Sequence, residues 1–241
     1  MDPVLAVFLL ALSTALATGL GAVPFLFGRL TRRWVGIANA VAAGLMGAAS
    51  WSLLVEGAGR DLDGTLLGLL LGVVFIAVSH RLLSGRDVHW GELDAGDAMK
   101  VLLILGVMTI HSFTEGVGVG VSFGGGEELG LYITAAIAVH NIPEGLAISL
   151  VMIPRGTSVA KAALWSIFSS LPQPLMAVPA FLLVSWFEPV LAPGLGFAAG
   201  AMLWMIVSEL VPEALRDAPR PAVAFSMLVS ILAMLGFQRL L

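Results

Sequence analysis

Hydrophobic residues occur along this 241-residue chain in long runs, and short polar stretches separate one run from the next. A bilayer hydrocarbon core about 30 Å thick takes roughly 20 residues of helix to cross. Runs of that length predict an all-α membrane protein with eight transmembrane helices in a single polytopic domain, residues 1–241. The expected spans are residues 4–27, 35–55, 66–83, 98–121, 129–153, 160–186, 190–211 and 223–240.

Composition agrees with a lipid environment, because 59% of the residues are hydrophobic and only 12% are charged, with a mean hydropathy of +0.99. Such values lie outside the range of soluble domains. The chain has no cysteine, so any metal must be held by nitrogen and oxygen ligands. Its net charge of -4 is spread over short loops and gives no basic patch for nucleic acid. The first run lacks a basic segment after Met1 and is too long for a signal peptide, so we expect it to be retained.

Lysine and arginine are distributed unevenly between the two sets of loops. If the N-terminus lies outside, only Arg60 and Arg239 are also outside. Because basic residues are retained on the cytoplasmic side, we predict that both termini are extracytoplasmic and that the protein is a multi-pass protein of the plasma or inner membrane. The basic residues assigned to the cytoplasmic side are Arg29, Arg32, Arg33, Arg81, Arg86, Lys100, Arg155, Lys161, Arg216 and Arg220.

Two internal repeats relate pairs of the predicted helices. Residues 42–61 align with residues 198–217, and ten of the twenty positions are identical. Residues 111–116 align in the same way with residues 140–145. Each repeat pairs two helices that cross the membrane in opposite directions, which predicts a 3+2+3 inverted-repeat arrangement centred on the fourth and fifth helices. Inverted repeats with a binding site at their interface are typical of transporters.

A histidine followed four residues later by a glutamate occurs twice, as His111 with Glu115 and as His140 with Glu144. Residues at this spacing share one face of a helix. A carboxylate at the bilayer centre costs about 2.5 to 3.5 kcal/mol, and a divalent cation would offset that cost. Two imidazoles and two carboxylates complete a neutral, four-coordinate shell that suits zinc. The alternative is that each histidine simply makes a hydrogen bond inside the protein core. That alternative explains one such pair better than it explains two, so these four residues are the predicted primary metal site.

Other polar residues in the predicted spans carry weaker predictions. Ser112 and Asn141 precede the two glutamates by three residues and could offer oxygen to an adjacent ion. Gln173 lies between two prolines and either faces the metal or caps freed carbonyl groups. Glu209 and Glu213 near the end of the seventh span form either an exit path or a solvated helix end.

The longest predicted cytoplasmic loop, residues 84–97, is rich in groups that could bind metal loosely or sense its level, although simple solvation explains them equally well. These groups in or beside the loop are His80, His89, Glu92, Asp94 and Asp97.

Small residues around the two histidine and glutamate pairs predict close helix packing. Gly116, Gly118, Gly120 and Gly145 would let the fourth and fifth helices approach one another. Pro143 removes a backbone donor and should bend its helix or free a carbonyl group, which membranes tolerate where backbone lines a cavity.

The motifs resemble those of the ZIP (Zrt/Irt-like) metal transporters, and within them the GufA-like branch, over nearly the whole chain. Residues 140–145, His-Asn-Ile-Pro-Glu-Gly, are similar to the family's metal motif in its fifth span, and residues 111–116 are similar to its partner in the fourth. Residues 48–54, 196–202 and 209–213 are similar to signatures of that branch. The resemblance implies eight helices with both termini outside. It also implies alternating access, in which a bundle of spans 1, 4, 5 and 6 slides against spans 2, 3, 7 and 8, often in a homodimer.

The resemblance also implies a secondary metal site bordered by Ser112, Asn141 and Gln173. This chain departs from the family pattern there, because its fourth span reads His-Ser-Phe-Thr-Glu instead of His-Asn-x-Pro-Glu, and Gln173 stands where a glutamate is usual. We therefore expect weak binding or none at the secondary site. Ser208 replaces an acid that often precedes Glu209 in relatives, which weakens the case for an exit path.

Together these features predict a transporter that carries divalent metal into the cytoplasm, with zinc as first choice and iron, manganese, cobalt or cadmium as alternatives. The metal is cargo, and neither a catalytic residue nor a catalytic cofactor is expected. The expected partners are the metal ion, the bilayer and a second copy of the chain. The alternatives are a membrane-embedded metalloenzyme, such as a metal-dependent hydrolase, and a metal sensor. The lack of a His-Glu-x-x-His motif and the inverted repeats argue against them.

Overall fold

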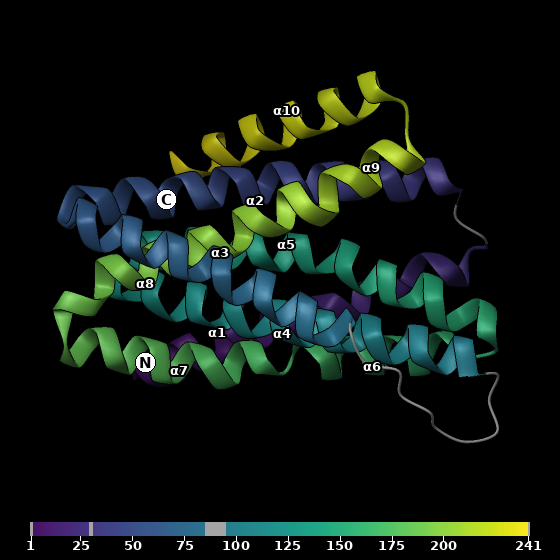
Figure 1. Cartoon of the computed structure of the whole chain (residues 1–241), viewed down its shortest axis with the longest axis horizontal. Coiled ribbons are helices and arrows are strands. Elements are labelled where there is room, and N and C mark those ends of the chain that lie inside the picture. The colour runs from purple at the N-terminus through teal and green to yellow at the C-terminus, as the bar shows by residue number, and fades with distance from the viewer. Residues whose placement is uncertain (1, 29–30, 85–94, 241) are drawn as a thin grey trace.

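The computed structural model describes residues 2–28, 31–84 and 95–240, and these residues form helices without any strand (Figure 1). This confirms the predicted all-α fold. Within the described residues, seven helical segments are long and apolar enough to cross a membrane: Pro3–Leu26, Arg32–Arg60, Leu62–Leu82, Glu127–Arg155, Val159–Trp186, Glu188–Asp217 and Arg220–Gln238. A further helix, α4 (Ala95–Gly125), has 31 residues and brings the long helical segments to eight.

Several of the long segments combine two helical elements, and Glu188–Asp217 combines four. The order is α1 (Pro3–Thr18), η1 (Gly19–Leu26), α2 (Arg32–Arg60), α3 (Leu62–Ser84), α4, α5 (Glu127–Met152), η2 (Ile153–Arg155), α6 (Val159–Ser170), α7 (Pro172–Trp186), η3 (Glu188–Val190), α8 (Leu191–Met205), η4 (Ile206–Leu210), α9 (Val211–Asp217) and α10 (Arg220–Gln238). η4 is a π-helical turn, whereas η1, η2 and η3 are 3-10 helices.

The connection between α3 and α4 differs from the predicted loop at residues 84–97. Residues 85–94, including His89, Glu92 and Asp94, lie outside the described residues. Residues 95–97 already belong to α4.

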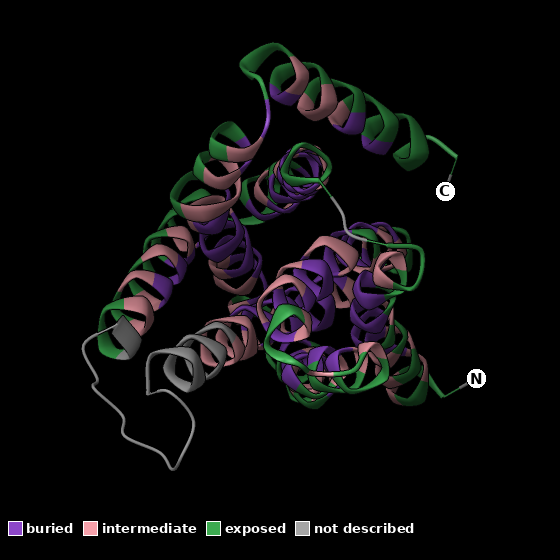
Figure 2. Cartoon of the chain, turned by 90° about the vertical axis from the view of Figure 1, so that its right-hand side faces the viewer, coloured by how far each residue is buried: buried purple, intermediate pink, exposed green. Residues whose placement is uncertain are grey.

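The helices pack as two groups that meet along a central interface. α1, α4, α5, α6 and α7 contact one another, and α2, α3, α8, α9 and α10 form the second group. The main contacts between the groups are those of α2 with α5 and of α4 with α8. Figure 2 shows the molecule from one end, with buried residues on the facing sides of the helices and exposed ones around the outside. The fourth and fifth helices therefore lie against both groups, at the centre of the molecule.

The expected role of the glycines in bringing α4 and α5 together is wrong. Gly116 and Gly120 of α4 face the backbone of α7, and Gly118 faces side chains of α8. Gly145 of α5 faces α1, where a Cβ would collide with the carbonyl oxygen of Thr18. The small residues thus let α4 and α5 approach their other neighbours, which holds both helices in place against the rest of the bundle.

Irregular backbone occurs where α1 and the sixth span lie side by side. α1 changes to a 3-10 helix at Gly19, and the sixth span breaks at Leu171, just before Pro172. The Thr18 and Ser170 hydroxyl oxygens, one at each irregularity, lie 2.8 Å apart in a hydrogen bond. Proline removes a backbone donor, and such breaks persist in membrane proteins where other groups satisfy the freed polar atoms.

Candidate metal site

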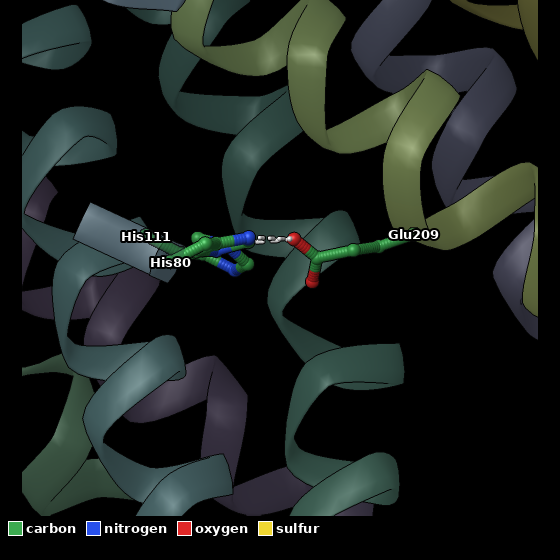
Figure 3. A group of neighbouring side chains, drawn as sticks. All are labelled: His80, His111 and Glu209. Atoms are coloured by element: carbon green, nitrogen blue, oxygen red, sulfur yellow. Dashed lines mark hydrogen bonds and ion pairs between the residues drawn. The ribbon is translucent and has the colours of Figure 1, made fainter. Parts of the chain in front are cut away.

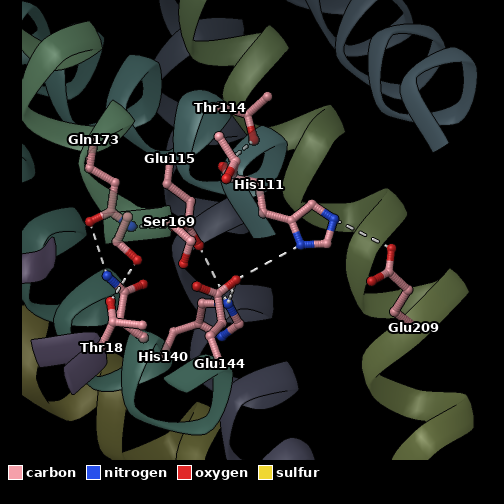
Figure 4. Close-up of polar contacts among 12 residues, drawn as sticks. Thr18, His111, Thr114, Glu115, His140, Glu144, Ser169, Gln173 and Glu209 are labelled. Atoms are coloured by element: carbon pink, nitrogen blue, oxygen red, sulfur yellow. Dashed lines mark hydrogen bonds and ion pairs between the residues drawn. The ribbon is translucent and has the colours of Figure 1, made fainter. Parts of the chain in front are cut away.

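The central feature of the interior is a group of three buried side chains from α4 and α5 (Figure 4). His140 Nε2 lies 3.4 Å from Glu115 Oε1 and 3.5 Å from Glu144 Oε1. The edge of a tetrahedron around zinc is roughly 3.3 Å when nitrogen and oxygen ligands bind at their usual 2.0 to 2.2 Å. His140 Nε2 therefore lies from each carboxylate at close to the spacing that one zinc ion requires, and the ligand atoms of the three residues lie within 4.8 Å of one another.

These three side chains are almost completely shielded from solvent, yet several of their polar atoms make no hydrogen bond to any described residue. Glu115 and His140 are 0% exposed and Glu144 is 5% exposed. Glu115 Oε1, both carboxylate oxygens of Glu144 and both ring nitrogens of His140 make no hydrogen bond within the described part of the chain. Buried polar atoms normally find a partner, because leaving them unpaired is costly. A bound cation would supply a partner for one atom of each residue, namely His140 Nε2 and a carboxylate oxygen of each glutamate.

The second oxygen of Glu115 is held by an amide network. Gln173 Nε2 donates a hydrogen bond of 2.6 Å to Glu115 Oε2. Asn141 Nδ2 in turn lies 3.0 Å from Gln173 Oε1 and 2.7 Å from the carbonyl oxygen of Thr14. The Thr14 hydroxyl lies 2.5 Å from the same Gln173 oxygen. Gln173 comes into this position because α7 starts anew directly after the break at Leu171.

Asn141 and Gln173 are therefore engaged with protein groups. Two atoms predicted to border a secondary site nevertheless make no hydrogen bond among the described residues, the Ser112 hydroxyl and Asn141 Oδ1.

His111, the fourth predicted ligand, lies between two clusters. Its Nδ1 is 3.8 Å from Glu144 Oε1, and its Nε2 is 3.4 Å from Glu209 Oε1. The side chain is 2% exposed. One ring nitrogen thus faces the α4–α5 cluster and the other faces a glutamate of the opposite helix group (Figure 4).

A second group with metal-ligand geometry consists of His80, His111 and Glu209, whose ligand atoms lie within 4.8 Å of one another (Figure 3). The Nε2 atoms of His80 and His111 are 3.1 Å apart. His80 Nδ1 is 3.2 Å from Glu209 Oε1. His111 belongs to this second cluster and faces Glu144 of the first, so the ligands form a continuous row from Glu115 to Glu209.

The π-helical turn η4 contains Glu209, the residue through which the second helix group joins this row. A π turn adds one residue to a helix turn and so changes the direction in which the following side chains point. The neighbouring Ser208 does not join the cluster through its hydroxyl, which donates instead to the carbonyl oxygen of Trp204 at 2.7 Å.

A cavity of about 410 Å³ reaches the ligand row from one end of the bundle. His111, His140 and Glu144 lie in its wall, together with Glu209 and Glu213. Its wall also contains Pro143, as expected for a proline whose backbone lines a cavity. The primary cluster is therefore open toward the end of the bundle that holds η2 and the beginning of α2.

Glu213 lies farther from the ligands than Glu209. Its Oε2 accepts a hydrogen bond of 3.2 Å from Asn39 of α2, which is 4% exposed. Both residues line the cavity.

Sequence reasoning missed parts of this arrangement. His80 was assigned to the region of the cytoplasmic loop, yet it lies inside the bundle beside His111. No sequence pattern predicts that Thr14 and Asn39 contact Gln173 and Glu213. The available signal was the presence of polar residues inside apolar runs, because such residues in membrane helices usually face the protein interior.

Comparison with known proteins identifies relatives over most of the chain. Residues 87–240 match the family described as ZIP zinc transporter. A protein of Arabidopsis thaliana, whose name proposes a role in zinc transport, is 48% identical over 95% of the chain. The zinc transporter GufA of Myxococcus xanthus is 35% identical over 83% of the chain and 85% of its own length. The zinc transporter ZIPB of Bordetella bronchiseptica is 30% identical over 73% of the chain and 62% of its own length.

The chain spans only 38% of the length of the Arabidopsis relative. The match to GufA, in contrast, covers most of both proteins. The chain therefore belongs to the ZIP zinc transporter family.

Proposed function

We propose that this protein carries divalent transition-metal ions across the membrane, with zinc as the main substrate, through a site formed by His111, Glu115, His140 and Glu144. The observation that carries the proposal is the group of unpartnered carboxylate and imidazole atoms buried in the centre of the bundle. Buried carboxylates are stable in such surroundings only when a cation or a hydrogen-bond donor compensates them. Nitrogen and oxygen ligands of this kind suit zinc and its neighbours.

The row of ligands suggests how the ion leaves the primary cluster. His111 has one ring nitrogen toward Glu144 and the other toward Glu209, so an ion could pass from the first cluster to the second by exchanging ligands at this ring. From Glu209 the cavity continues to Glu213. Several successive sites that each bind the ion weakly favour its passage, because the ion must leave each site as readily as it binds.

The charge distribution supports import into the cytoplasm. The cavity opens at the end of the bundle where Arg32, Arg155 and Arg216 lie, and basic loops are retained inside the cell. With that end inside, both termini lie outside. The repeat of residues 42–61 at 198–217 fits an inverted-repeat transporter in which two helix groups move against each other. Assembly as a homodimer completes the proposal. Family membership favours transport over the metalloenzyme and sensor alternatives.

Zinc uptake into proteoliposomes tests this function. We expect wild-type protein to fill liposomes that contain a fluorescent zinc reporter, and we expect His140→Ala to reduce the rate to that of empty liposomes, because this ring contacts both glutamates. Glu188→Ala, an exposed position in η3 away from the ligands, is the control and should retain transport. Wild-type protein that moves no zinc under any ion gradient would contradict the proposed function.

The amide network supports a single metal ion at the primary cluster. Gln173 already donates a hydrogen bond to one carboxylate oxygen of Glu115, and its neutral amide cannot offset the charge of a second cation. We expect zinc-soaked crystals to show one anomalous peak at Glu115 in the wild type and two in Gln173→Glu, which adds a carboxylate at the same place. Two fully occupied metal positions beside Glu115 in the wild type would contradict this prediction.

A further inference from the structure

A separate cavity with basic walls lies where α2 begins and where α9 passes into α10. It measures about 380 Å³ and is lined by Arg32, Arg216 and Asp217, with Val35 and Leu150 completing the wall. Figure 1 shows the start of α2 and the α9–α10 connection at the same end of the bundle. None of these residues belongs to the metal clusters or lines the metal cavity.

A close backbone contact brings the two arginines together. A Cβ on Gly36 of α2 would lie 2.8 Å from both the nitrogen and the Cβ of Ala218, so the chains touch at this point. Arg32 lies one helical turn before Gly36, and Arg216 precedes Ala218 by two residues. The backbone contact therefore fixes the positions from which the two arginine side chains extend.

The positive charge around this cavity is poorly neutralised. Arg216 has acidic neighbours only at 3.9 Å, the Oε1 of Glu213 and the Oδ1 of Asp217. Arg32, and the exposed Arg33 and Arg220 on either side of the Gly36 contact, form no ion pair with any described residue. Arginine is suited to phosphate, because its planar donors can bind two oxygens at once.

The backbone adds further donors for an anion. α2 and α10 both begin at this end, and neither Thr31 nor Pro219 provides a side-chain cap. The first backbone N–H groups of a helix lack partners within the helix, and the helix dipole favours an anion there. The start of α2, where Arg32 lines the cavity, therefore adds to the attraction for an anion, whereas α10 offers fewer donors because Pro221 has no backbone N–H.

The cavity also has an apolar part, which points to a lipid. Val35 and Leu150 belong to membrane-spanning segments, so the arginines lie at the boundary between apolar and polar regions. Basic pockets between transmembrane helices on the cytoplasmic side bind anionic headgroups.

We propose that this cavity binds the phosphate of an anionic phospholipid headgroup. The lipid would connect α2 and α9 of one helix group with Leu150 on α5 of the other. It would thereby act at the end of the interface between the two groups, away from the metal ligands.

Native mass spectrometry of the purified full chain tests the proposal by comparing phosphatidylglycerol with phosphatidylcholine. We expect the wild type to retain phosphatidylglycerol preferentially, and Arg32→Gln combined with Arg216→Gln to bind it about 30-fold more weakly, given the usual contribution of each arginine near a membrane surface. Lys161→Gln combined with Arg239→Gln removes the same charge elsewhere and should bind like the wild type. Arg32→Lys with Arg216→Lys should keep a clear preference for the anionic lipid.

Inorganic phosphate, added as a competitor, distinguishes a lipid site from a general anion site. We expect millimolar phosphate to leave the bound phosphatidylglycerol in place. Displacement of the lipid by free phosphate would overturn the assignment to a phospholipid. A wild type without preference for phosphatidylglycerol, or equal losses in the Arg32/Arg216 and Lys161/Arg239 variants, would overturn the site itself.

Discussion

A Glu144→Gln variant is expected to bind its most tightly held zinc ion about 100-fold more weakly than the wild type, or more weakly still. Loss of groups that merely orient a metal ligand costs roughly 10- to 100-fold in affinity, and Glu144 is proposed to contact the ion directly. Glutamine has nearly the same size, so the substitution removes charge and leaves the packing intact. Isothermal titration calorimetry of the detergent-solubilised protein measures the change.

Glu127→Gln is the matched control for this experiment. Glu127 lies in the first turn of the same helix and is exposed at the other end of the bundle from the metal cavity. Its replacement should leave the zinc affinity within a factor of about two. If Glu144→Gln bound zinc as tightly as this control, the ion would have to bind elsewhere, and the His80–His111–Glu209 cluster would be the first place to look.

A Gly145→Ala variant is expected to unfold at a temperature about 10 °C lower than the wild type. The added Cβ would collide with the carbonyl oxygen of Thr18, and backbone cannot move aside as a side chain can. Overpacking of this kind typically costs about 1 to 3 kcal/mol and sometimes more. Intrinsic fluorescence during heating in detergent measures the unfolding temperature.

Gly47→Ala provides the comparison, because a Cβ on Gly47 in the middle of α2 meets nothing within 4 Å. Alanine favours a helix over glycine by about 1 kcal/mol, so this variant should unfold at the same temperature or a higher one. Equal unfolding temperatures for the two variants would show that α1 and α5 are less tightly packed than the structure indicates. The contact matters for function, since Gly145 directly follows Glu144 and holds that turn of α5 against α1.

Much of the candidate site could be read from local spacing. A histidine and a glutamate four residues apart share a helix face in any α-helix, so each pair was recognisable before the fold was known. Asn141 is likewise part of the α5 motif. The helical segments themselves followed from the length of the apolar runs, because backbone groups in lipid must be satisfied within a helix.

Other features depend on contacts between distant parts of the chain. The hydrogen bond from Gln173 to Glu115 exists because the sixth span breaks at Leu171, and a proline-rich sequence does not specify where the new helix will point. The glycines of α4 illustrate the same limit, since their sequence position shows that something approaches closely but not which helix does so.

The sequence by itself determined the helical class, the family and the paired histidine and glutamate ligands, since these depend on apolar length and on spacing within one helix. Only the tertiary structure decided that His80 and Glu209, 129 positions apart, meet at His111. The physical reason is that membrane helices are apolar on nearly all sides, so the periodic pattern that reveals the buried face of a soluble helix is weak. Which polar side chains share the interior is therefore fixed by helix packing, through small residues and backbone breaks that act across the whole chain.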